Sequence, residues 1–401
     1  MPRIVFAALL ALVGTFLAPA AQAQAPAVRD PGARAAAARP SQTDARAAVP
    51  TLLVRRLVTG LDHPWDVRPI GDGQLIYTQR SRATVSIWTG DAKRVVRDFP
   101  SDSVWVSTDS PETGLMGLET DADFATNRRF YTCQGWLLGG GRHDVRVMSW
   151  TLDDALTRVT SSTTLLTGLP TTSGRHGGCR IVQVGDRLYV GTGDAATGTN
   201  PENLRSLGGK TLCLLTSGAP CPSNPFVHAR NHDKRFVHTY GHRNVQGIDV
   251  RKDGTLWSVE QGTYRDDEVN LLRNGADYGY NPVPGYNESV PMTDSSLPGR
   301  QRAAVWRSGD PTLATSGGGF VYGSGWGVYD GTFAVAALKA ERVLFLKLSK
   351  AGKLQGVRVP SALRKFGRMR TVVDGPGNVA YATTDNGDGH DAILLIRPRL
   401  R

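Results

Sequence analysis

The segment at residues 252–260, "KDGTLWSVE", shows the pattern on which the fold depends. An Asp-Gly pair is followed directly by a short run of apolar, β-branched and aromatic residues, which is a strong β-hairpin signal. Similar segments, each with a turn residue ahead of a short strand, occur five more times: "GDGQLIYT" (71–78), "NRRFYTCQ" (127–134), "VGDRLYVGT" (184–192), "YDGTFAVAAL" (329–338) and "GPGNVAYATT" (375–384). Helical periodicity is scarce. The sequence therefore predicts an all-β protein.

The spacing of these segments narrows the fold further. Their first strand residues lie 47 to 76 residues apart, at Leu75, Phe130, Leu188, Leu256, Thr332 and Val379. Six units of this size, each long enough for four short strands, predict a six-bladed β-propeller with four-stranded antiparallel blades. A pair of β-sandwiches would give less regular spacing. In a propeller the loops at one end converge on the central channel, so residues distant in sequence meet there.

The N-terminus is typical of a secretory signal. Arg3 precedes an apolar run from Ile4 to Leu17, and Ala21-Gln22-Ala23 follows as a small-residue cleavage pattern. The apolar run is short for a membrane span, although an uncleaved anchor is the alternative. No other segment approaches the length of a span. We expect a secreted or periplasmic protein with three parts: a signal peptide (1–23), a disordered Ala/Pro/Arg-rich lead-in (24–50) and a catalytic propeller (51–401).

The charge and the cysteine content limit the possible binding partners and the cellular compartment of the protein. The formal net charge is +11, but the basic residues are spread along the chain. Nucleic-acid binding would need a basic stripe with interleaved aromatic residues, so no nucleic-acid partner is predicted. Four cysteines fit an oxidising compartment and allow three connectivities. Cys213 and Cys221 are close enough to join one hairpin, leaving Cys133 with Cys179; free buried thiols are the alternative.

Two glycine-containing loops ahead of predicted strands carry candidate catalytic residues. His176 lies in "TTSGRHGGCRIV" (171–182). Histidine changes charge near neutrality and is the default general base, although a hydrogen-bonding role in a turn is common. Arg243 and Asn244 lie in "TYGHRNVQGIDV" (239–250). The planar guanidinium suits a carboxylate or a developing oxyanion, and a salt bridge within the loop is the alternative.

Three further cations form a candidate anion site. Arg368 and Arg370 are two residues apart at the start of a predicted strand, so they point to the same face. Two guanidinium groups on one face repel each other unless an anion or an acid lies between them. Lys339, in "AALKAERV" (336–343), adds a possible third cation. Ordinary surface charges are the alternative.

An acidic segment, "EQGTYRDDEVNLL" (260–272), is the candidate cation site. Calcium takes oxygen ligands from carboxylates and backbone carbonyls. Asp266, Asp267 and Glu268 supply carboxylates, and the Gly262-Thr263 turn can present carbonyls. The helix pattern of a calcium-binding loop is missing, so the site would be irregular. The alternative is a solvated turn.

Taken together, these segments resemble the soluble pyrroloquinoline quinone (PQQ)-dependent aldose sugar dehydrogenases of the glucose/sorbosone dehydrogenase family. The similarity runs from about Val54 to Leu395 and implies a six-bladed propeller, in agreement with the repeat count. It rests on seven motifs in order: "LDHPWDV", "ETGLMGLETDADFATNRRFY", "HGGCRIVQVGDRLYVGTGD", "NLRSLGGKTL", "YGHRNVQG", "EQGTYRDDEVNLLRNGADYGY" and "ATSGGGFVY".

The resemblance implies roles for individual residues. His176 falls on the family's catalytic histidine, and Arg243 and Asn244 fall on its Arg-Asn pair at the cofactor. The cations Lys339, Arg368 and Arg370 match those that hold the quinone, and Glu112 stands where the best-known sugar oxidisers have a glutamine near the cofactor. The carbonyls of Gly262 and Thr263 match the ligands of the cofactor's calcium. Glu268 and the backbone of Tyr278 match a second, structural calcium.

The implied reaction is oxidation of an aldose at C1 to the lactone. Hydride would pass to calcium-bound PQQ, with His176 as general base and Arg243 beside the reacting atoms. Thr263 replaces the family's usual proline, Tyr280 replaces a common tryptophan, and Arg175 adds a bulky charge at the mouth. The identity of the sugar, the electron acceptor and the choice between monomer and dimer therefore stay open.

Two other functions compete with this interpretation. One is a catalytically inactive propeller that binds a glycan or a protein partner. The joint presence of His176, Arg243, Arg368 and Arg370 speaks against it, because a pure binding module does not need all four. The other is a propeller lactonase or phosphotriesterase. That function needs a channel calcium held by several side-chain carboxylates, whereas the acidic residues here lie in one local loop.

Overall fold

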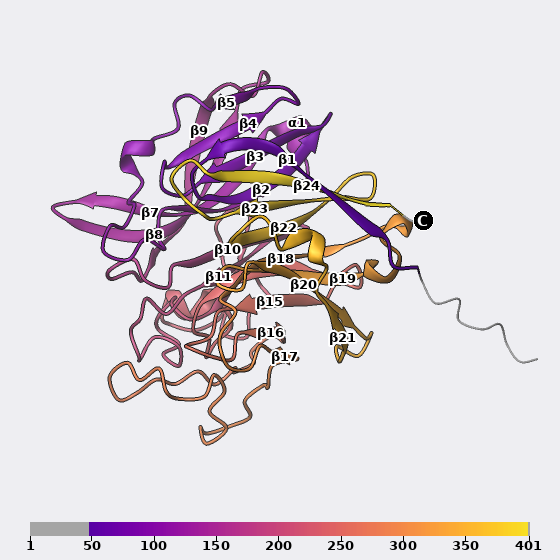
Figure 1. Ribbon diagram of the computed structural model, residues 1–401. Coiled ribbons are helices and arrows are strands. Elements are labelled where there is room, and N and C mark those ends of the chain that lie inside the picture. The colour runs from indigo at the N-terminus through magenta and orange to yellow at the C-terminus, as the bar shows by residue number, and fades with distance from the viewer. Residues whose placement is uncertain (1–47, 400–401) are drawn as a thin grey trace, which may run out of the picture. The chain divides into compact units, whose positions relative to one another are not determined.

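The computed structural model describes residues 48–399. The predicted signal peptide and most of the predicted lead-in lie outside the described residues. Residues 48–399 form 24 strands in six separate sheets, each of four antiparallel strands (Figure 1). The predicted all-β, six-bladed propeller with four-stranded blades is confirmed.

The first five blades are each built from four consecutive strands. The strands of the first three blades are β2 (Pro64–Gly71), β3 (Gln74–Gln79), β4 (Thr84–Trp88) and β5 (Lys93–Val95); β6 (Leu115–Thr120), β7 (Arg129–Gly139), β8 (Arg142–Leu152) and β9 (Val159–Leu169); and β10 (Gly178–Val184), β11 (Arg187–Thr192), β12 (Thr211–Leu215) and β13 (Val237–Thr239). Those of the fourth and fifth blades are β14 (Val245–Val250), β15 (Leu256–Glu260), β16 (Glu268–Leu271) and β17 (Trp306–Arg307), then β18 (Thr315–Val321), β19 (Thr332–Ala337), β20 (Arg342–Leu348) and β21 (Leu354–Arg358).

The sixth blade joins the two ends of the described chain. Its strands are β22 (Met369–Gly375), β23 (Val379–Thr384), β24 (Asp391–Arg399) and, outermost, β1 (Thr51–Leu61). β1 pairs antiparallel with β24, from Thr51 opposite Arg399 to Leu61 opposite Asp391. This pairing closes the ring by hydrogen bonds between strands that lie more than 300 residues apart in sequence.

The innermost strands surround a common axis. β2 contacts β6, β6 contacts β10, β10 contacts β14, β14 contacts β18, β18 contacts β22, and β22 contacts β2. This closed order of contacts is what a propeller requires. The start of each innermost strand and the end of each second strand therefore lie at the same end of the axis.

The six turn-and-strand segments of the sequence are the second strands of the six blades, namely β3, β7, β11, β15, β19 and β23. In four blades a short turn of two to five residues joins the first and second strands, whereas α1 (Phe124–Asn127) lies between β6 and β7 and the 3-10 helix Ser324–Tyr329 lies between β18 and β19. Between β2 and β3, Asp72 and Gly73 both have positive φ, at 49° and 73°. Such a turn matches the twist of the flanking strands and favours Asp-Gly.

Apolar side chains fill the spaces between neighbouring blades, so the core is divided into six clusters. In one of them Trp257 and Val259 of β15 pack against Phe333 and Val335 of β19. A disulfide between Cys133 and Cys179 also joins two blades, from β7 to β10. The second disulfide links Cys213 of β12 to Cys221. The expected pairing of the four cysteines is confirmed.

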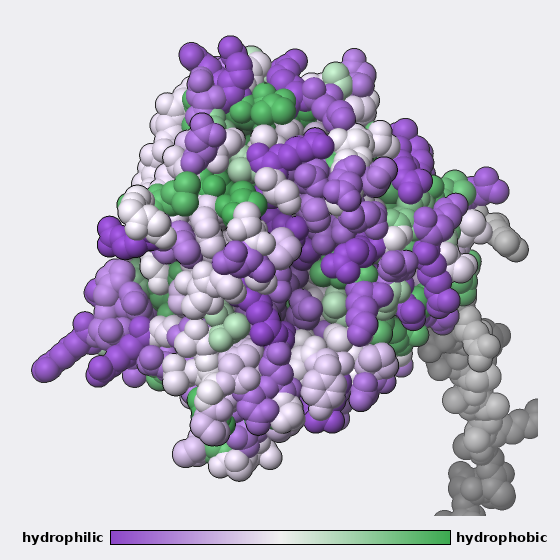
Figure 2. Space-filling model, turned by 60° about the vertical axis from the view of Figure 1, so that its left-hand side comes forward, coloured by the Kyte–Doolittle hydropathy of each residue, from purple (hydrophilic) through white to green (hydrophobic). Residues whose placement is uncertain are grey.

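Helical structure is limited to short turns. The described residues contain one α-helix, α1 (Phe124–Asn127), and four 3-10 helices, Ser101–Ser103, Asp233–Phe236, Ser324–Tyr329 and Ser361–Leu363. Among residues 48–399, no helix has the length and apolar character needed to cross a membrane. The face in Figure 2 is mostly hydrophilic, with small separate apolar patches.

Candidate active site

The loops at one end of the axis enclose a polar cavity of about 350 Å³. Two larger grooves, of about 440 and 510 Å³, lie along outer strands of the sixth and fifth blades and contain none of the predicted site residues. The axial cavity receives residues from five blades: His63, Arg80, Ser110, Pro111, Glu112, Gln246, Gln261, Ala314, Leu338, Arg368, Arg370, Asp385 and Asn386. Three of the predicted cofactor residues, Glu112, Arg368 and Arg370, are among them.

His176 stands on the third blade beside this cavity, in the loop that leads into β10. Its backbone has φ of +56°, and its N–H donates to Oε2 of Glu112 at 2.8 Å. Gly193 makes this position possible, because a Cβ there would lie 1.7 Å from the carbonyl oxygen of His176. A glycine on the neighbouring loop therefore allows the histidine backbone to approach closely.

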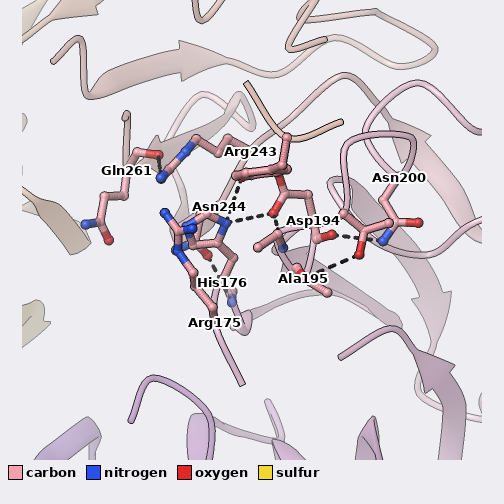
Figure 3. Close-up of polar contacts among 12 residues, drawn as sticks. Arg175, His176, Asp194, Ala195, Asn200, Arg243, Asn244 and Gln261 are labelled. Atoms are coloured by element: carbon pink, nitrogen blue, oxygen red, sulfur yellow. Dashed lines mark hydrogen bonds and ion pairs between the residues drawn. The ribbon is translucent and has the colours of Figure 1, made fainter. Parts of the chain in front are cut away.

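The imidazole of His176 is held by a buried carboxylate. Nδ1 lies 2.7 Å from Oδ1 of Asp194 (Figure 3). The hydroxyl of Tyr286 bridges the pair, at 3.0 Å from Nδ1 and 2.8 Å from Oδ2 of Asp194. Asp194 is fully buried. A carboxylate on Nδ1 favours the tautomer that carries its proton there, which leaves the lone pair on Nε2. This is the arrangement of a general base.

Arg243 and Asn244 border the same centre from the loop before β14 (Figure 3). Nη1 of Arg243 donates to the carbonyl of Gln261 at 3.1 Å, and Nη2 is paired with Glu288. Burial alone would lower the pKa of Arg243, but the surrounding phenols and carboxylates hold it above its usual value. Oδ1 of Asn244 accepts the N–H of Gly178 at 3.1 Å. The guanidinium is thus permanently charged inside the protein.

The predicted arginine pair of the sixth blade does face one cavity, with an acid between its members. Nη2 of Arg370 lies 2.6 Å from Oδ2 of Asp385, and Nη2 of Arg368 lies 3.8 Å from the same oxygen. Burial favours the neutral acid, but the charges of Arg370 and Arg80 hold the pKa of Asp385 below its usual value. Burial and the nearby Arg370 lower the pKa of Arg80 to about 10. The wall thus holds three guanidinium groups against two carboxylates, those of Asp385 and Glu112, so it carries excess positive charge.

Lys339 lies apart from these cations. It is exposed, in the turn after β19, and follows Leu338, which does line the cavity. The structure brings Arg368 and Arg370 together with Glu112 and does not place Lys339 in the cavity wall. A role for Lys339 at the cofactor stays a prediction.

The acidic segment forms a tight turn with buried carbonyl groups. Gly262 and Thr263 are buried, and neither carbonyl oxygen accepts a hydrogen bond from residues 48–399. A Cβ on Gly262 would lie 2.2 Å from the carbonyl oxygen of Arg265, so the turn needs glycine there. Thr263 also has a buried hydroxyl with no partner in the described part of the chain. Oxygen atoms of this kind suit a hard cation such as Ca²⁺.

The carboxylate of Asp267 has a structural task in this turn. Its oxygens accept the N–H of Gly262 at 3.0 Å, the hydroxyl of Thr312 at 2.9 Å and the N–H of Leu313 at 2.6 Å. Asp266 is half-buried and lies 3.6 Å from Nε of Arg265. The unpartnered buried oxygens of the turn are therefore the backbone carbonyls of Gly262 and Thr263 and the hydroxyl of Thr263.

Glu268 and Tyr278 lie farther out on the fourth blade. Glu268 is buried opposite Glu260 and pairs with Nε of Arg307 at 3.0 Å. Burial and the charge of Glu260 raise the pKa of Glu268 to about 8. The ring of Tyr278 stacks on His242, whose Nδ1 lies 2.8 Å from Glu260. An added cation would relieve the repulsion between the two buried glutamates.

One group of potential metal-binding side chains lies beside the cavity among residues 48–399, namely Asp62, His63 and Asp391. The carboxylate of Asp391 already accepts the hydroxyl of Thr384 and three backbone N–H groups at 2.6 to 3.0 Å. Its lone pairs are therefore used within the protein. This cluster stabilises the loop after β23 rather than presenting free ligands.

Several buried polar atoms around the cavity have no hydrogen-bond partner within the described residues. They are Nε of Arg243, Nδ2 of Asn244, Oγ1 of Thr263, Nε of Arg370 and Oδ1 of Asp385. Buried polar groups are nearly always paired in folded proteins, so a cluster of unpaired ones calls for a polar ligand. Most of these atoms are donors, and the wall is cationic. The residues present thus fit an anionic group that accepts hydrogen bonds.

Sequence reasoning missed four residues of this site. Asp194, Tyr286, Glu288 and Asp385 contact the predicted residues directly. Asp194 follows a predicted strand, in "GTGDAATG" (191–198). The available signal was this position, because loops after such strands converge with the loop of His176 at one end of a propeller. Tyr286 and Glu288 belong to a long connection without a strand pattern, which offers no signal.

Known proteins share this architecture. The glucose / sorbosone dehydrogenase family matches residues 61–397. The chain is 25% identical over 362 residues to the aldose sugar dehydrogenase YliI of Escherichia coli, covering 88% of this chain and 95% of the relative. The PQQ-bound aldose sugar dehydrogenase of Streptomyces coelicolor superposes with a TM-score of 0.71 at 25% identity, covering 88% of this chain and 100% of that one. The apo soluble aldose sugar dehydrogenase of E. coli gives 0.77 at 25%, covering 87% and 100%.

The fold and the site define a class, namely six-bladed propellers with a buried His-Asp pair beside a cationic axial cavity. Within that class the chain belongs to the glucose/sorbosone dehydrogenase family. The resemblance drawn from the seven motifs is thereby confirmed. The prediction that the protein is an enzyme of the sugar dehydrogenase class is confirmed with it.

Proposed function

We propose that the protein oxidises an aldose sugar at C1 to the lactone, with PQQ and Ca²⁺ as cofactors. The observation that carries this proposal is the buried His176–Asp194 pair beside a cavity whose wall has more guanidinium groups than carboxylates. A base next to an anion-binding cavity is what a quinone-dependent alcohol oxidation requires. The names of the relatives support the same substrate class and the same quinone.

Arg368 and Arg370 would hold carboxylates of the quinone, with Lys339 at the rim. Arg243, Asn244 and Glu112 would contact its polar atoms. The unpartnered nitrogens of Arg243, Asn244 and Arg370 support this assignment. When bound, PQQ supplies the two-electron acceptor, and Ca²⁺ polarises it as a Lewis acid.

The chain itself would manage the proton. Nε2 of His176 takes the proton of the C1 hydroxyl, because Asp194 holds Nδ1. Asp194 then stabilises the charge that develops on the imidazole. Arg243 supplies a fixed positive charge beside the oxygen on which negative charge grows. Base assistance of this kind is typically worth about 10²–10⁴-fold in rate.

We assign the calcium ions to two places on the fourth blade. The carbonyls of Gly262 and Thr263 would ligate the ion at the cofactor, since they are buried and accept no hydrogen bond from residues 48–399. Glu268 and the backbone of Tyr278 would ligate a structural ion. The raised pKa of Glu268, about 8, supports a need for positive charge there beyond that of Arg307.

We further propose that the protein works outside the cytoplasm, after removal of residues 1–23. The signal-like N-terminal sequence and the two disulfides support an oxidising compartment. The electrons would pass from the enzyme to an acceptor that the sequence does not identify. A small neutral sugar is the expected substrate.

Reconstitution tests the proposed function. Purified apoprotein titrated with PQQ and Ca²⁺ should show a stoichiometric change in the quinone absorbance and then reduce an artificial dye with at least one sugar of an aldose panel. Binding without turnover on every aldose would instead favour a propeller that only binds a glycan or protein. No stoichiometric binding of the quinone would refute the cofactor assignment.

The variant His176→Asn tests the base. Asparagine tolerates positive φ, so it should keep the local backbone while removing the imidazole. We expect turnover to fall by about 10²–10⁴-fold, the range of base catalysis, with the dissociation constant of the quinone changed less than about threefold. The exposed His390→Ala is the matched control and should retain full activity. Full activity of His176→Asn would remove His176 from the mechanism.

A further inference from the structure

The connection between β16 and β17, residues 272–305, reaches back over the active site. It forms the orange loops below these two strands in Figure 1. Its cover segment, residues 282–289, is closed by a hydrogen bond from the N–H of Asn287 to the carbonyl of Pro282 at 2.8 Å. The segment rests on the third blade at Gly198, where a Cβ would lie 2.0 Å from the carbonyl oxygen of Gly285.

The cover segment places two side chains on the residues that the reaction needs. The hydroxyl of Tyr286 contacts both His176 and Asp194. One carboxylate oxygen of Glu288 accepts a hydrogen bond from Nη2 of Arg243, and the other accepts one from Nη2 of Arg175 at 2.7 Å. His176 and Arg243, which these two side chains contact, are each only 3% exposed. A sugar therefore cannot reach either residue while the segment stays in this position.

Glu288 is an anion in the place where a ligand of Arg243 would bind. Its side chain is 32% exposed, and partial burial favours the neutral acid, but the hydrogen bonds from Arg175 and Arg243 lower its pKa to about 2. It therefore remains ionised over the whole neutral range, and protonation does not release it. Release requires a competing partner for Arg243, or screening of the two ion pairs by salt.

The geometry points to a latched cover: Glu288 serves as an internal anion that holds residues 282–289 over His176 and Arg243 until a ligand of the axial cavity replaces it on Arg243. Arg175 anchors the other oxygen of Glu288 and stacks over Tyr286, with Cζ 5.6 Å from the ring centre. The latch lowers the affinity for the ligand, because only the fraction of molecules with the cover open can bind.

The identity of the ligand as PQQ rests on the proposed function, whereas the latch is a property of the ligand-free protein. Hydrogen-deuterium exchange of the full-length, ligand-free chain therefore tests it first. We expect Glu288→Gln to speed exchange at residues 282–289 by tenfold or more. Asp294→Asn is the matched control: it removes the same charge from the same connection, but its carboxylate contacts Ser296 rather than an arginine. It should leave that exchange unchanged.

Quinone titration gives the second measurement. Glu288→Gln should bind PQQ with Ca²⁺ about five- to tenfold more tightly than the unaltered protein, because the competing anion is gone. Weaker binding would overturn the latch and make Glu288 a residue that holds the ligand. Unchanged exchange at residues 282–289 would overturn it as well. If the unaltered protein fails to bind PQQ, the proposed function fails, and the exchange measurement still decides the latch.

A steric variant tests whether the seating of the cover segment on the third blade, in addition to the charge of Glu288, keeps the segment closed. Gly198→Ala puts a methyl group against the carbonyl of Gly285 and should displace the cover segment without changing the charge of Glu288. We expect exchange at residues 282–289 to rise by tenfold or more here too. Exchange at the rate of the unaltered protein would show that the segment does not close by seating on the third blade.

Discussion

Two cavities lie along the same innermost strands, and they differ in how far carboxylates of the chain offset their buried guanidinium groups. The axial site cavity, about 350 Å³, is lined at the starts of these strands by three arginines around Asp385. The second cavity, about 130 Å³, lies farther along the strands, next to Arg68, Glu119, Arg180 and Asp249. Both cavities are polar, and both are lined by residues on or next to the innermost strands of the blades.

The charges of the second cavity are matched within the protein. Asp66 takes Arg68 on one oxygen at 2.6 Å and Arg180 on the other at 2.5 Å, and Glu119 pairs with Arg68 at 3.1 Å. The guanidinium of Arg180 also packs over Trp65, with Cζ 4.0 Å from the ring centre. This network joins the first, second and third blades. Its carboxylates offset its guanidinium groups within the chain, so the charges are balanced without a ligand, although Nη2 of Arg180 has no hydrogen-bond partner among residues 48–399.

The comparison separates two uses of a buried charge. A guanidinium whose counterion is in the chain stabilises the fold, whereas cations in excess of the nearby carboxylates are available to a ligand. Substitutions in the second cavity should therefore change stability, and substitutions in the site cavity should change binding. The three variants below test this division, from the largest expected effect to the smallest.

Asp66→Asn removes the shared counterion of Arg68 and Arg180. Breaking a buried ion pair by removing one partner typically costs about 3–5 kcal/mol, and we expect a loss of that order in the free energy of unfolding. Chemical denaturation followed by tryptophan fluorescence measures it. The quinone affinity of the folded protein should stay within about twofold of the unaltered value. A stable variant with weakened binding would contradict the division.

Asp249→Asn should act through pH. Burial raises the pKa of Asp249 to about 7, so the folded chain binds a proton more tightly than the unfolded chain, and this group lowers stability as pH rises from about 4 to about 7. The amide mimics the neutral acid. The variant should match the unaltered protein near pH 4 and exceed it by up to about 4 kcal/mol at pH 8.

Melting curves of both proteins between pH 4 and pH 8 give this comparison. Parallel curves across the whole range would mean that Asp249 titrates normally. The quinone affinity, measured at pH 7, should be the same for the two proteins, since Asp249 lies in the second cavity.

Arg368→Gln should have the smallest effect and should alter binding alone. The side chain is 44% exposed and lies 3.8 Å from Asp385, so the ion pair contributes at most about 1 kcal/mol to stability. We expect the quinone to bind about tenfold more weakly, because one charge-assisted contact is lost. Arg364→Gln, an exposed arginine outside the cavity, is the matched control. Equal affinities of the two variants would remove Arg368 from the site.

The sequence predicted the ring of blades well because each blade repeats one local event. The turn ahead of β3, with positive φ at Asp72 and Gly73, depends only on neighbouring residues, and short turns also precede β11, β15 and β23. β7 and β19 follow short helices, but each still begins after a residue of positive φ, Arg128 and Gly331. The cysteine pairing followed in part from the short separation of Cys213 and Cys221 along the sequence, eight residues. The loops of His176 and Arg243 were found because glycines mark them.

Long-range contacts could not be predicted in the same way. Asp385 is one acidic residue among many until β23 brings it between Arg368 and Arg370. The place of Lys339 is likewise not set by the sequence: its side chain is exposed in the turn after β19, next to Leu338 of the cavity wall, and its role at the cofactor stays a prediction. In both cases a contact depends on where a loop ends in space.

The amino-acid sequence by itself determined the number of blades, the second strand of each and the family, because these follow from local turn chemistry and from motif order. Only the tertiary structure decided that Asp194 holds His176 and that Glu288 covers Arg243. The physical reason is ring closure. It brings loops from different blades to one end of the axis, and which side chains meet there depends on the packing of all six blades together.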